Sequence, residues 1–419
     1  MAWIVKLRHP GHYLKSFIKW VLLGSLMGIL GGLLGALFHH ALHGVTHVRQ
    51  LHPWLIFLLP AGGLLSVALY RLLGLRSNRG TNEIIDAVLD GQHVKPQIAP
   101  AIFAAAAITH CLGGSAGREG AALQLGGSTA SLLGRIFRLK KNDRKVLIMS
   151  GMSAVFAGLF GTPLTATLFC MEFESVGTLF SPALLPCYLA AFVASRVSGA
   201  LGVHAETAFL ETVTALSWQN VWKFILLAVL LAGLGIAMCQ FFHKMEHWAK
   251  RFIKNDWLRI ALGGALILAM TLLVGDHRYN GAGMDMALQA VAGKADWYDF
   301  ALKMLFTAIT LAAGFKGGEI VPTFCIGATF GCLVGMLLGL DPGMAAALGL
   351  VGLFCCATNS PFASIVLSVE MFGSGNVHLF ALVCVICFVL SGKIGLYSSQ
   401  IIQFDQASAM LEDENEKVS

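Results

Sequence analysis

The segment GREGAALQLGG, residues 117–127, places an arginine and a glutamate side by side in a glycine-rich run. Apolar sequence precedes it in residues 101–114 and follows it in residues 128–137. Ionisable side chains are costly at membrane depth, and those that occur there usually line the paths of water, ions or protons. Glu119 is therefore the first candidate for a functional side chain, with Arg118 as its immediate neighbour.

The composition indicates that these residues belong to a membrane protein. The chain has 419 residues, of which 56% are hydrophobic and 12% are charged. That charged fraction is about half of the value in soluble domains, and the mean hydropathy is +0.73. Apolar stretches recur from about residue 21 to about residue 400. At roughly 20 residues per span they predict on the order of a dozen helical segments, so we expect an all-α integral membrane protein.

The formal net charge of +6 comes from short loops and termini rather than from a surface for nucleic acid. Basic residues gather in the N-terminal segment 1–19 and in RLKKNDRK at 138–145, and the positive-inside rule places both in the cytoplasm. A polar tail follows at 406–419, and no removable signal peptide is recognised. We expect a multi-pass protein of the cell membrane with both termini in the cytoplasm.

The chain contains two related halves, because three segments recur in the same order at nearly the same spacing. Residues 153–173 resemble 352–372, residues 117–129 resemble 317–329, and residues 80–91 resemble 281–293 more weakly. Repeats of this kind are common in transporters. We predict one membrane repeat at residues 20–205 and a second at 206–405, inverted relative to each other if each contains an odd number of spans. The recurring glutamates are Glu119 and Glu172 in the first half, and Glu319 and Glu370 in the second.

Transporter repeats place their substrate site between them near the middle of the membrane, where broken helices point N-terminal N–H groups at an anion. The glycines within residues 113–120 would end one helix and begin another, so Glu119 falls in a first helical turn. Its counterpart Glu319 precedes Pro322, which suits a helix start. Two helix starts, each with a glutamate, could converge on one site. A carboxylate that must be protonated to leave an anion site would gate it and couple protons to the anion.

These motifs resemble those of the CLC family of chloride channels and anion/proton antiporters, over roughly residues 70–400. The family motif GREGP, whose glutamate is the external gate, reads GREGA here, with Ala121 in place of proline. The motif GxFxP resembles GEIVP at 318–322. GKIGLY at 392–397 resembles the segment whose tyrosine touches the central anion, so the resemblance assigns that role to Tyr397. It implies a CLC-like fold of two repeated halves around a midplane anion site.

Three departures from the family pattern resemble the fluoride-exporting branch of the family. The segment NRGTN at 78–82 stands where the family has GSGIP, and therefore lacks its anion-coordinating serine. Phe173 stands where chloride/proton antiporters carry an inner proton-relay glutamate. The segment GGEI at 317–320 replaces the phenylalanine of GxFxP with Ile320. The resemblance implies a proton-coupled fluoride exporter, expected to be a bacterial homodimer. The alternative is a chloride/proton antiporter or a passive chloride channel on the same fold.

A physical account supports two carboxylates at such a site. Fluoride is small and strongly hydrated, so removing its water requires concentrated hydrogen-bond donors. Neighbouring carboxylates disfavour each other's charged forms, which helps one of them to hold a proton. We expect Glu119 and Glu319 to serve as gate and proton-coupling groups. The residues expected to bind the anion lie in the matched motifs: Gly80, Thr81, Asn82, Gly117, Gly120, Ile320, Val321 and Tyr397.

Structural roles remain as alternatives for several charged residues. Arg118 is expected to serve as a structural partner rather than as an anion ligand. Glu319 could instead form a fixed ion pair with Lys316. The matching positions of Glu172 and Glu370 favour a structural role at helix ends.

The sequence offers little support for other chemistry. His39, His43 and His47 share one helical stripe, but without accompanying cysteine or carboxylate a partly solvated helix end is favoured over a metal site. No GxSxG or HExxH motif supports a hydrolase, so no enzyme activity, metal or cofactor is expected. Helix N-termini favour anions, which argues against a cation channel. The expected partners are fluoride or chloride, protons and the lipid bilayer.

Overall fold

The computed structural model describes residues 10–75, 79–173, 175–208, 210 and 217–402. Part of the predicted basic N-terminus and the whole predicted polar tail therefore lie outside the described residues. In the first half of the chain the elements are α1 Pro10–Leu51, η2 Pro53–Leu58, α2 Leu59–Leu72, α3 Thr81–Asp90, α4 Ile98–Leu112, α5 Glu119–Ile136, α6 Lys141–Phe160, α7 Pro163–Glu172, β1 Ser175–Val176, η3 Ser181–Ala183 and α8 Leu184–Ala200.

The second half contains α9 Val221–Phe252, α10 Asp256–Val274, α11 Met284–Val291, α12 Asp299–Ala313, α13 Ile320–Leu338, α14 Pro342–Thr358, α15 Pro361–Phe372, η4 Ser374–Asn376, α16 Val377–Ser391 and β2 Ile401–Ile402. The described residues thus form sixteen α-helices, more than the dozen segments expected. Seven helical segments are long and apolar enough to cross a membrane. The estimate was low because several helices, such as α3 and α7, are much shorter than a span.

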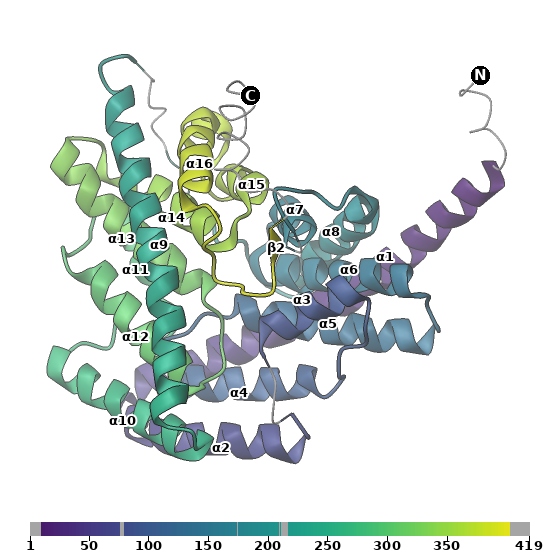
Figure 1. The fold of residues 1–419 in the computed structure, drawn as a ribbon, viewed down its shortest axis with the longest axis horizontal. Coiled ribbons are helices and arrows are strands. Elements are labelled where there is room, and N and C mark those ends of the chain that lie inside the picture. The colour runs from purple at the N-terminus through teal and green to yellow at the C-terminus, as the bar shows by residue number, and fades with distance from the viewer. Residues whose placement is uncertain (1–9, 76–78, 174, 209, 211–216, 403–419) are drawn as a thin grey trace, which may run out of the picture.

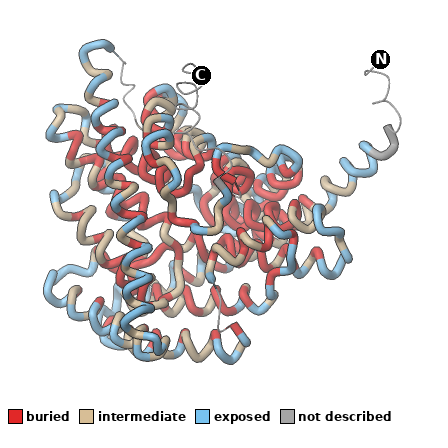
Figure 2. Tube along the Cα trace, viewed as in Figure 1, coloured by how far each residue is buried: buried red, intermediate tan, exposed pale blue. Residues whose placement is uncertain are grey.

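Long helices frame the molecule, and short ones end inside it (Figure 1). The 42-residue α1 runs diagonally across the view, and the 32-residue α9 runs from the top left toward the bottom. Buried residues concentrate in the centre, whereas the outer faces of the surrounding helices are exposed (Figure 2). Many exposed side chains on those faces are large and apolar, such as Leu72 and Leu273, as expected for helices that contact lipid.

Glycines allow the inner helices to approach closely at corresponding places in the two halves. A side chain at Gly126 on α5 would run into the backbone of Gly151 on α6. A side chain at Gly327 on α13 would likewise run into the backbone of Gly349 on α14. Small residues at helix interfaces are the usual means of close packing in membranes. Close contacts between glycines therefore pack α5 against α6 and α13 against α14 in the same way.

The two halves also cap each other's helices. The Glu172 carboxylate, at the end of α7, accepts hydrogen bonds from the backbone N–H groups of Phe362 and Ala363 at 3.1 and 2.8 Å. The Glu370 carboxylate, on α15, accepts from the N–H groups of Leu164 and Thr165 at 3.0 and 2.8 Å. Each glutamate satisfies donors at a helix start that have no partner within their own helix. The predicted structural role of this glutamate pair is confirmed.

A short parallel ladder fixes the segment near the end of the described chain. Strand β1 pairs with β2, with Ser175 opposite Ile401 and Val176 opposite Ile402. Leu396 N–H also donates to the carbonyl of Ala357, at 2.8 Å. These contacts hold the non-helical segment that carries Tyr397 against the helices of both halves.

Candidate functional site

Helices α5 and α13 begin side by side at the centre of the molecule. Gly117 and Gly318, just before the two helices, exchange backbone hydrogen bonds, with N–O distances of 2.6 and 2.7 Å. Glu119 is the first residue of α5, and Glu319 immediately precedes α13. The expected convergence of two helix starts, each with a glutamate, is therefore present. Both helices direct backbone donors and positive dipole ends toward this junction.

The Glu119 carboxylate already occupies a place suited to an anion. Its Oε2 accepts from the backbone N–H groups of Arg118 and Val321, at 3.0 and 3.2 Å. Its Oε1 has no hydrogen-bond partner among the described residues, and the side chain is fully buried. A side chain at Gly117 would collide with this carboxylate and would lie 2.9 Å from the Pro322 ring. The glycine therefore leaves room for a negative group between the two helix starts.

Glu319 and Thr81 approach α5 at Gly120, the residue after Glu119. A Cβ atom built at Gly120 would lie 3.2 Å from the Thr81 hydroxyl oxygen and 3.6 Å from Oε2 of Glu319. Thr81 is the first residue of α3, and Gly80 before it has a φ of 65°, a conformation that favours glycine. The starts of three helices, one of them from the second half, thus meet at Gly120.

Tyr397 adds a hydroxyl group that has no protein partner. The hydroxyl is buried and makes no hydrogen bond within the described chain, and its electrostatic neighbours include Glu319 and Glu119. Its ring packs edge-on against Phe173, with centroids 4.9 Å apart. Asn82 Oδ1 accepts from the N–H of Ser399 at 3.1 Å, which ties α3 to the tyrosine segment. A buried donor without a partner at this place is suited to an anion.

The predicted site residues fall into two neighbouring groups. Gly117, Gly120, Ile320 and Val321 belong to the junction of α5 and α13. Gly80, Thr81, Asn82, Glu319 and Tyr397 line a vestibule of about 680 Å³. The structure therefore places each of these predicted residues either at the junction or in the vestibule wall. Their roles in binding and proton coupling stay predictions.

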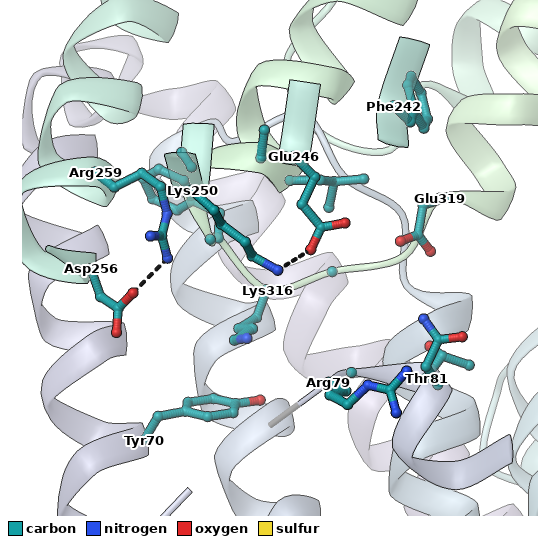
Figure 3. A pocket seen from close by; sticks show the side chains of 18 of the residues that line it. Tyr70, Arg79, Thr81, Phe242, Glu246, Lys250, Asp256, Arg259, Lys316 and Glu319 are labelled. Carbon is teal, nitrogen blue, oxygen red and sulfur yellow. Dashed lines mark hydrogen bonds and ion pairs between the residues drawn. The ribbon is translucent and has the colours of Figure 1, made fainter. Parts of the chain in front are cut away.

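The vestibule carries more basic than acidic side chains (Figure 3). Its walls come mainly from α2, α9, α12 and the segment between α12 and α13, with further residues from α3, α4, α5, α10 and the segment that carries Tyr397. The cationic lining residues are Arg71, Arg79, Lys250, Arg259 and Lys316, and the acidic ones are Glu246, Asp256 and Glu319. Such a lining favours the entry of anions.

Two nearby polar residues were not predicted from the sequence. Gln124 lies one turn after Gly120 and donates to its carbonyl at 3.1 Å, and its buried Oε1 has no partner among the described residues. It was detectable as the one uncharged polar side chain of residues 117–127. Glu206 pairs with Arg118 from the segment between the two halves. No motif surrounds Glu206, so this contact could not be predicted from the sequence.

Arg118 acts as a structural partner, as expected. Its guanidinium pairs with Glu206, contacts His39 Nδ1 at 3.2 Å, and lies over the Phe160 ring at 5.1 Å. Its Nε remains 3.8 Å from Oε1 of Glu119. The alternative ion pair between Lys316 and Glu319 does not occur, since no such pair lies within 4.0 Å among the residues the structure places.

The histidine stripe lies on α1 beside this arginine. The His39 and His43 rings stack with centroids 6.2 Å apart. In the part of the chain that is described, no group of three histidine, cysteine or acidic side chains could hold a metal ion. His39 is the member of the stripe that contacts Arg118.

Comparisons with known proteins agree with this geometry. The family model for the voltage-gated chloride channel matches residues 62–392. The chloride/fluoride channel protein of Pseudomonas syringae pv. tomato is 36% identical over 410 residues, which cover 94% of this chain and 89% of the relative. The H(+)/Cl(-) exchange transporter ClcA of Yersinia pestis bv. Antiqua is 24% identical over 287 residues, 65% of this chain and 59% of the relative.

Solved structures show the same architecture. The crystal structure of a CLC-type fluoride/proton antiporter has a TM-score of 0.88 at 33% identity, and the match covers 92% of this chain and 98% of that one. A slow cyanobacterial Cl−/H+ antiporter has a TM-score of 0.76 at 21% identity, covering 95% and 98%, and shares the fold. The chain therefore belongs to the voltage-gated chloride channel family, the CLC family, and is an all-α membrane protein with the CLC fold.

Proposed function

We propose that this protein is a proton-coupled fluoride exporter, a fluoride/proton antiporter. The observation that carries the proposal is the carboxylate of Glu119, which sits on the N–H groups of Arg118 and Val321 where an anion would sit. The anion can take that place only when Glu119 leaves it, and protonation weakens its hold on the two donors. Similarity to a CLC-type fluoride/proton antiporter supports the same function.

Glu319 supplies the second proton-carrying group of the proposal. Its carboxylate lines the vestibule and approaches Gly120, next to Glu119. Phe173 occupies the position of the inner relay glutamate of chloride/proton antiporters, and its ring packs on Tyr397 instead. A proton that arrives at Glu119 would therefore pass to Glu319 and leave through the vestibule.

The anion would follow the same path in the opposite direction. It would enter the basic vestibule and pass the start of α3 and the hydroxyl of Tyr397. It would then reach the backbone N–H groups of Arg118 and Val321, which Glu119 occupies in this structure. Thr81 and Asn82 would contribute to the inner part of this path, and Ile320 and Val321 to the outer part through their backbone N–H groups. Chloride is the alternative ion, because relatives named for chloride transport share the family.

We also propose that the vestibule opens to the cytoplasm. Lys19 near the start of α1 pairs with Asp143 in the basic segment 138–145, at 2.6 Å, so both lie on one side. Helix α1 and the segment Pro53–Leu72 are each long and apolar enough to cross the membrane. Two crossings return the chain at Arg71, in the vestibule wall, to that same side. The positive-inside rule makes it the cytoplasmic side of the cell membrane.

The remaining assignments follow the family resemblance. We propose two membrane repeats bounded near residues 20–205 and 206–405, and a homodimer with one pathway in each subunit. The first boundary lies inside α1, which begins at Pro10. The mass of the purified protein in detergent, measured by light scattering, distinguishes the dimer from a monomer.

Flux measurements test the proposed function. Proteoliposomes are loaded separately with fluoride and with chloride, and anion efflux and external pH are recorded together. Fluoride efflux with proton uptake and little chloride efflux supports the proposal. Rapid chloride efflux, with or without protons, supports the alternative. In Glu119→Gln protein we expect anion movement to lose its coupling to protons, and anion flux with intact coupling would contradict the gate.

A further inference from the structure

Lys316 is a cation in the vestibule wall that has no acidic partner among the described residues. It lies in the segment between α12 and α13, three residues before Glu319. The other four cations of the wall have acidic partners: Arg79 pairs with Asp86, Lys250 with Glu246, and Arg71 and Arg259 share Asp256. Within the described chain, no hydrogen-bond acceptor and no carboxylate contacts Lys316.

The electrostatic surroundings of Lys316 do not neutralise it either. Its charged neighbours are Lys250, Glu246, Arg259 and Asp256, two of each sign that pair among themselves. Lys316 is half-buried and lines the vestibule. Its ammonium, which no described side chain neutralises, can therefore meet an anion that enters the vestibule.

Tyr70 on α2 lies directly beneath this lysine (Figure 3). The lysine Nζ is 4.6 Å from the centroid of the tyrosine ring, within the range of a cation–π contact. Tyr70 lines the same vestibule and is 5% exposed, and its buried hydroxyl has no hydrogen-bond partner among the described residues. Two donors that lack an acceptor thus lie side by side, from elements distant in the sequence.

We infer that Lys316 and Tyr70 form a binding site for a small monovalent anion on its way between the vestibule and the Glu319 region. The inference rests on the proposed function, for which the anion is fluoride. An anion accepts hydrogen bonds from the ammonium and from the phenolic hydroxyl, and so satisfies both groups together. The tyrosine hydroxyl is buried in this structure, so the anion reaches it when the side chains around it shift.

The position of the pair suits a strongly hydrated ion. Fluoride would lose part of its water to the lysine and the tyrosine before it meets the narrower junction of the helix starts. The positive charge also offsets the repulsion between an incoming anion and Glu319. A site at this position affects the affinity for an anion that enters from the vestibule, and it takes no part in proton transfer.

The experiment compares initial fluoride efflux at increasing internal sodium fluoride, with proton uptake recorded in parallel. The variants are Lys316→Met, Lys316→Arg and Tyr70→Phe, with Lys254→Met as the control because Lys254 is exposed and lies outside the vestibule lining. We expect Lys316→Met to raise the KM for fluoride roughly tenfold and Tyr70→Phe to raise it roughly threefold, from the usual strengths of charged and neutral hydrogen bonds. Lys316→Arg and Lys254→Met should retain the wild-type KM, and all variants should keep the wild-type fluoride-to-proton ratio.

Two results would overturn the inference. An unchanged KM in both Lys316→Met and Tyr70→Phe would show that neither group binds the anion. A changed fluoride-to-proton ratio at constant KM in Lys316→Met would show that the lysine carries protons. Tyr70→Phe, which removes a single oxygen atom, decides the question if Lys316→Met does not fold. If the wild-type protein moves chloride instead of fluoride, only the proposed function fails, and the same comparison is made with chloride.

Discussion

The reciprocal glutamate caps predict a measurable loss of stability when Glu172 is replaced. Glu172 is 4% exposed and accepts two backbone N–H groups, from Phe362 and Ala363, at the start of α15. Alanine leaves both donors without an acceptor, and each buried donor without a partner costs about 1–3 kcal/mol. We therefore expect Glu172→Ala to lower the free energy of unfolding by about 2–4 kcal/mol, somewhat less than the full sum because water can reach a loosened helix end. Glu172→Gln retains one acceptor oxygen and should lose about half as much.

The symmetry of the fold provides an internal comparison. Glu370 caps α7 through two backbone N–H groups and also accepts from the Thr165 hydroxyl at 2.6 Å, but it is only partly buried, so water can replace it more easily. Glu370→Ala should therefore cost less than Glu172→Ala. Asp143→Asn serves as the control, because its ion pair with Lys19 is about one third exposed and such pairs contribute about 0–1 kcal/mol.

Unfolding followed by fluorescence in mixed detergent micelles measures these differences, and proton uptake in proteoliposomes is recorded for the same variants. Glu172→Gln should keep the wild-type fluoride-to-proton ratio. Wild-type stability in Glu172→Ala together with lost proton coupling would refute the reasoning, because it would place Glu172 in the proton path rather than at a helix cap.

Three further substitutions test the site itself. Glu206→Gln frees the guanidinium of Arg118 to strengthen its existing ion pair with Glu119, where Nε and Oε1 lie 3.8 Å apart, and should slow fluoride turnover roughly tenfold at an unchanged fluoride-to-proton ratio; a wild-type rate would contradict this. Gly318→Ala places a methyl group 2.5 Å from the backbone nitrogen of Gly120 and 3.2 Å from that of Glu119 and should reduce transport by roughly tenfold or more, whereas normal flux would show that the helix starts can separate freely. Glu319→Gln should abolish proton uptake, and retained uptake in a pH-electrode assay would assign the inner proton step to another group.

The features that could be predicted from the sequence are those that repeat or break a pattern. Matching motifs located the two helix starts, and the glycines of residues 113–120 placed Glu119 in a first turn, where the structure has it. The matched spacing from proline to glutamate indicated that Glu172 and Glu370 lie at helix ends. It did not reveal that each caps a helix of the other half, because that exchange depends on how α7 and α15 pack.

Contacts between elements distant in the sequence could not be predicted. Glu206 lies in the segment between the halves and reaches Arg118 only because the folded chain crosses the start of α5. The position of Lys316, three residues before Glu319, suggests an ion pair with that glutamate. Its side chain instead lies over Tyr70, more than 200 residues earlier in the chain. The number of helices was underestimated for a related reason. Short helices that end inside the molecule carry too few apolar residues to be counted as separate spans.

The central claim is that proton entry drives fluoride out against its own gradient. The most direct measurement sets fluoride equal on both sides of a proteoliposome membrane, imposes a pH gradient, and follows fluoride with an electrode while the membrane voltage is clamped to zero. The account predicts net fluoride movement opposite to the proton flow, and its loss in Glu119→Gln protein. Fluoride that stays at equilibrium under the pH gradient, although it exchanges rapidly across the membrane, would show a passive channel and contradict the account.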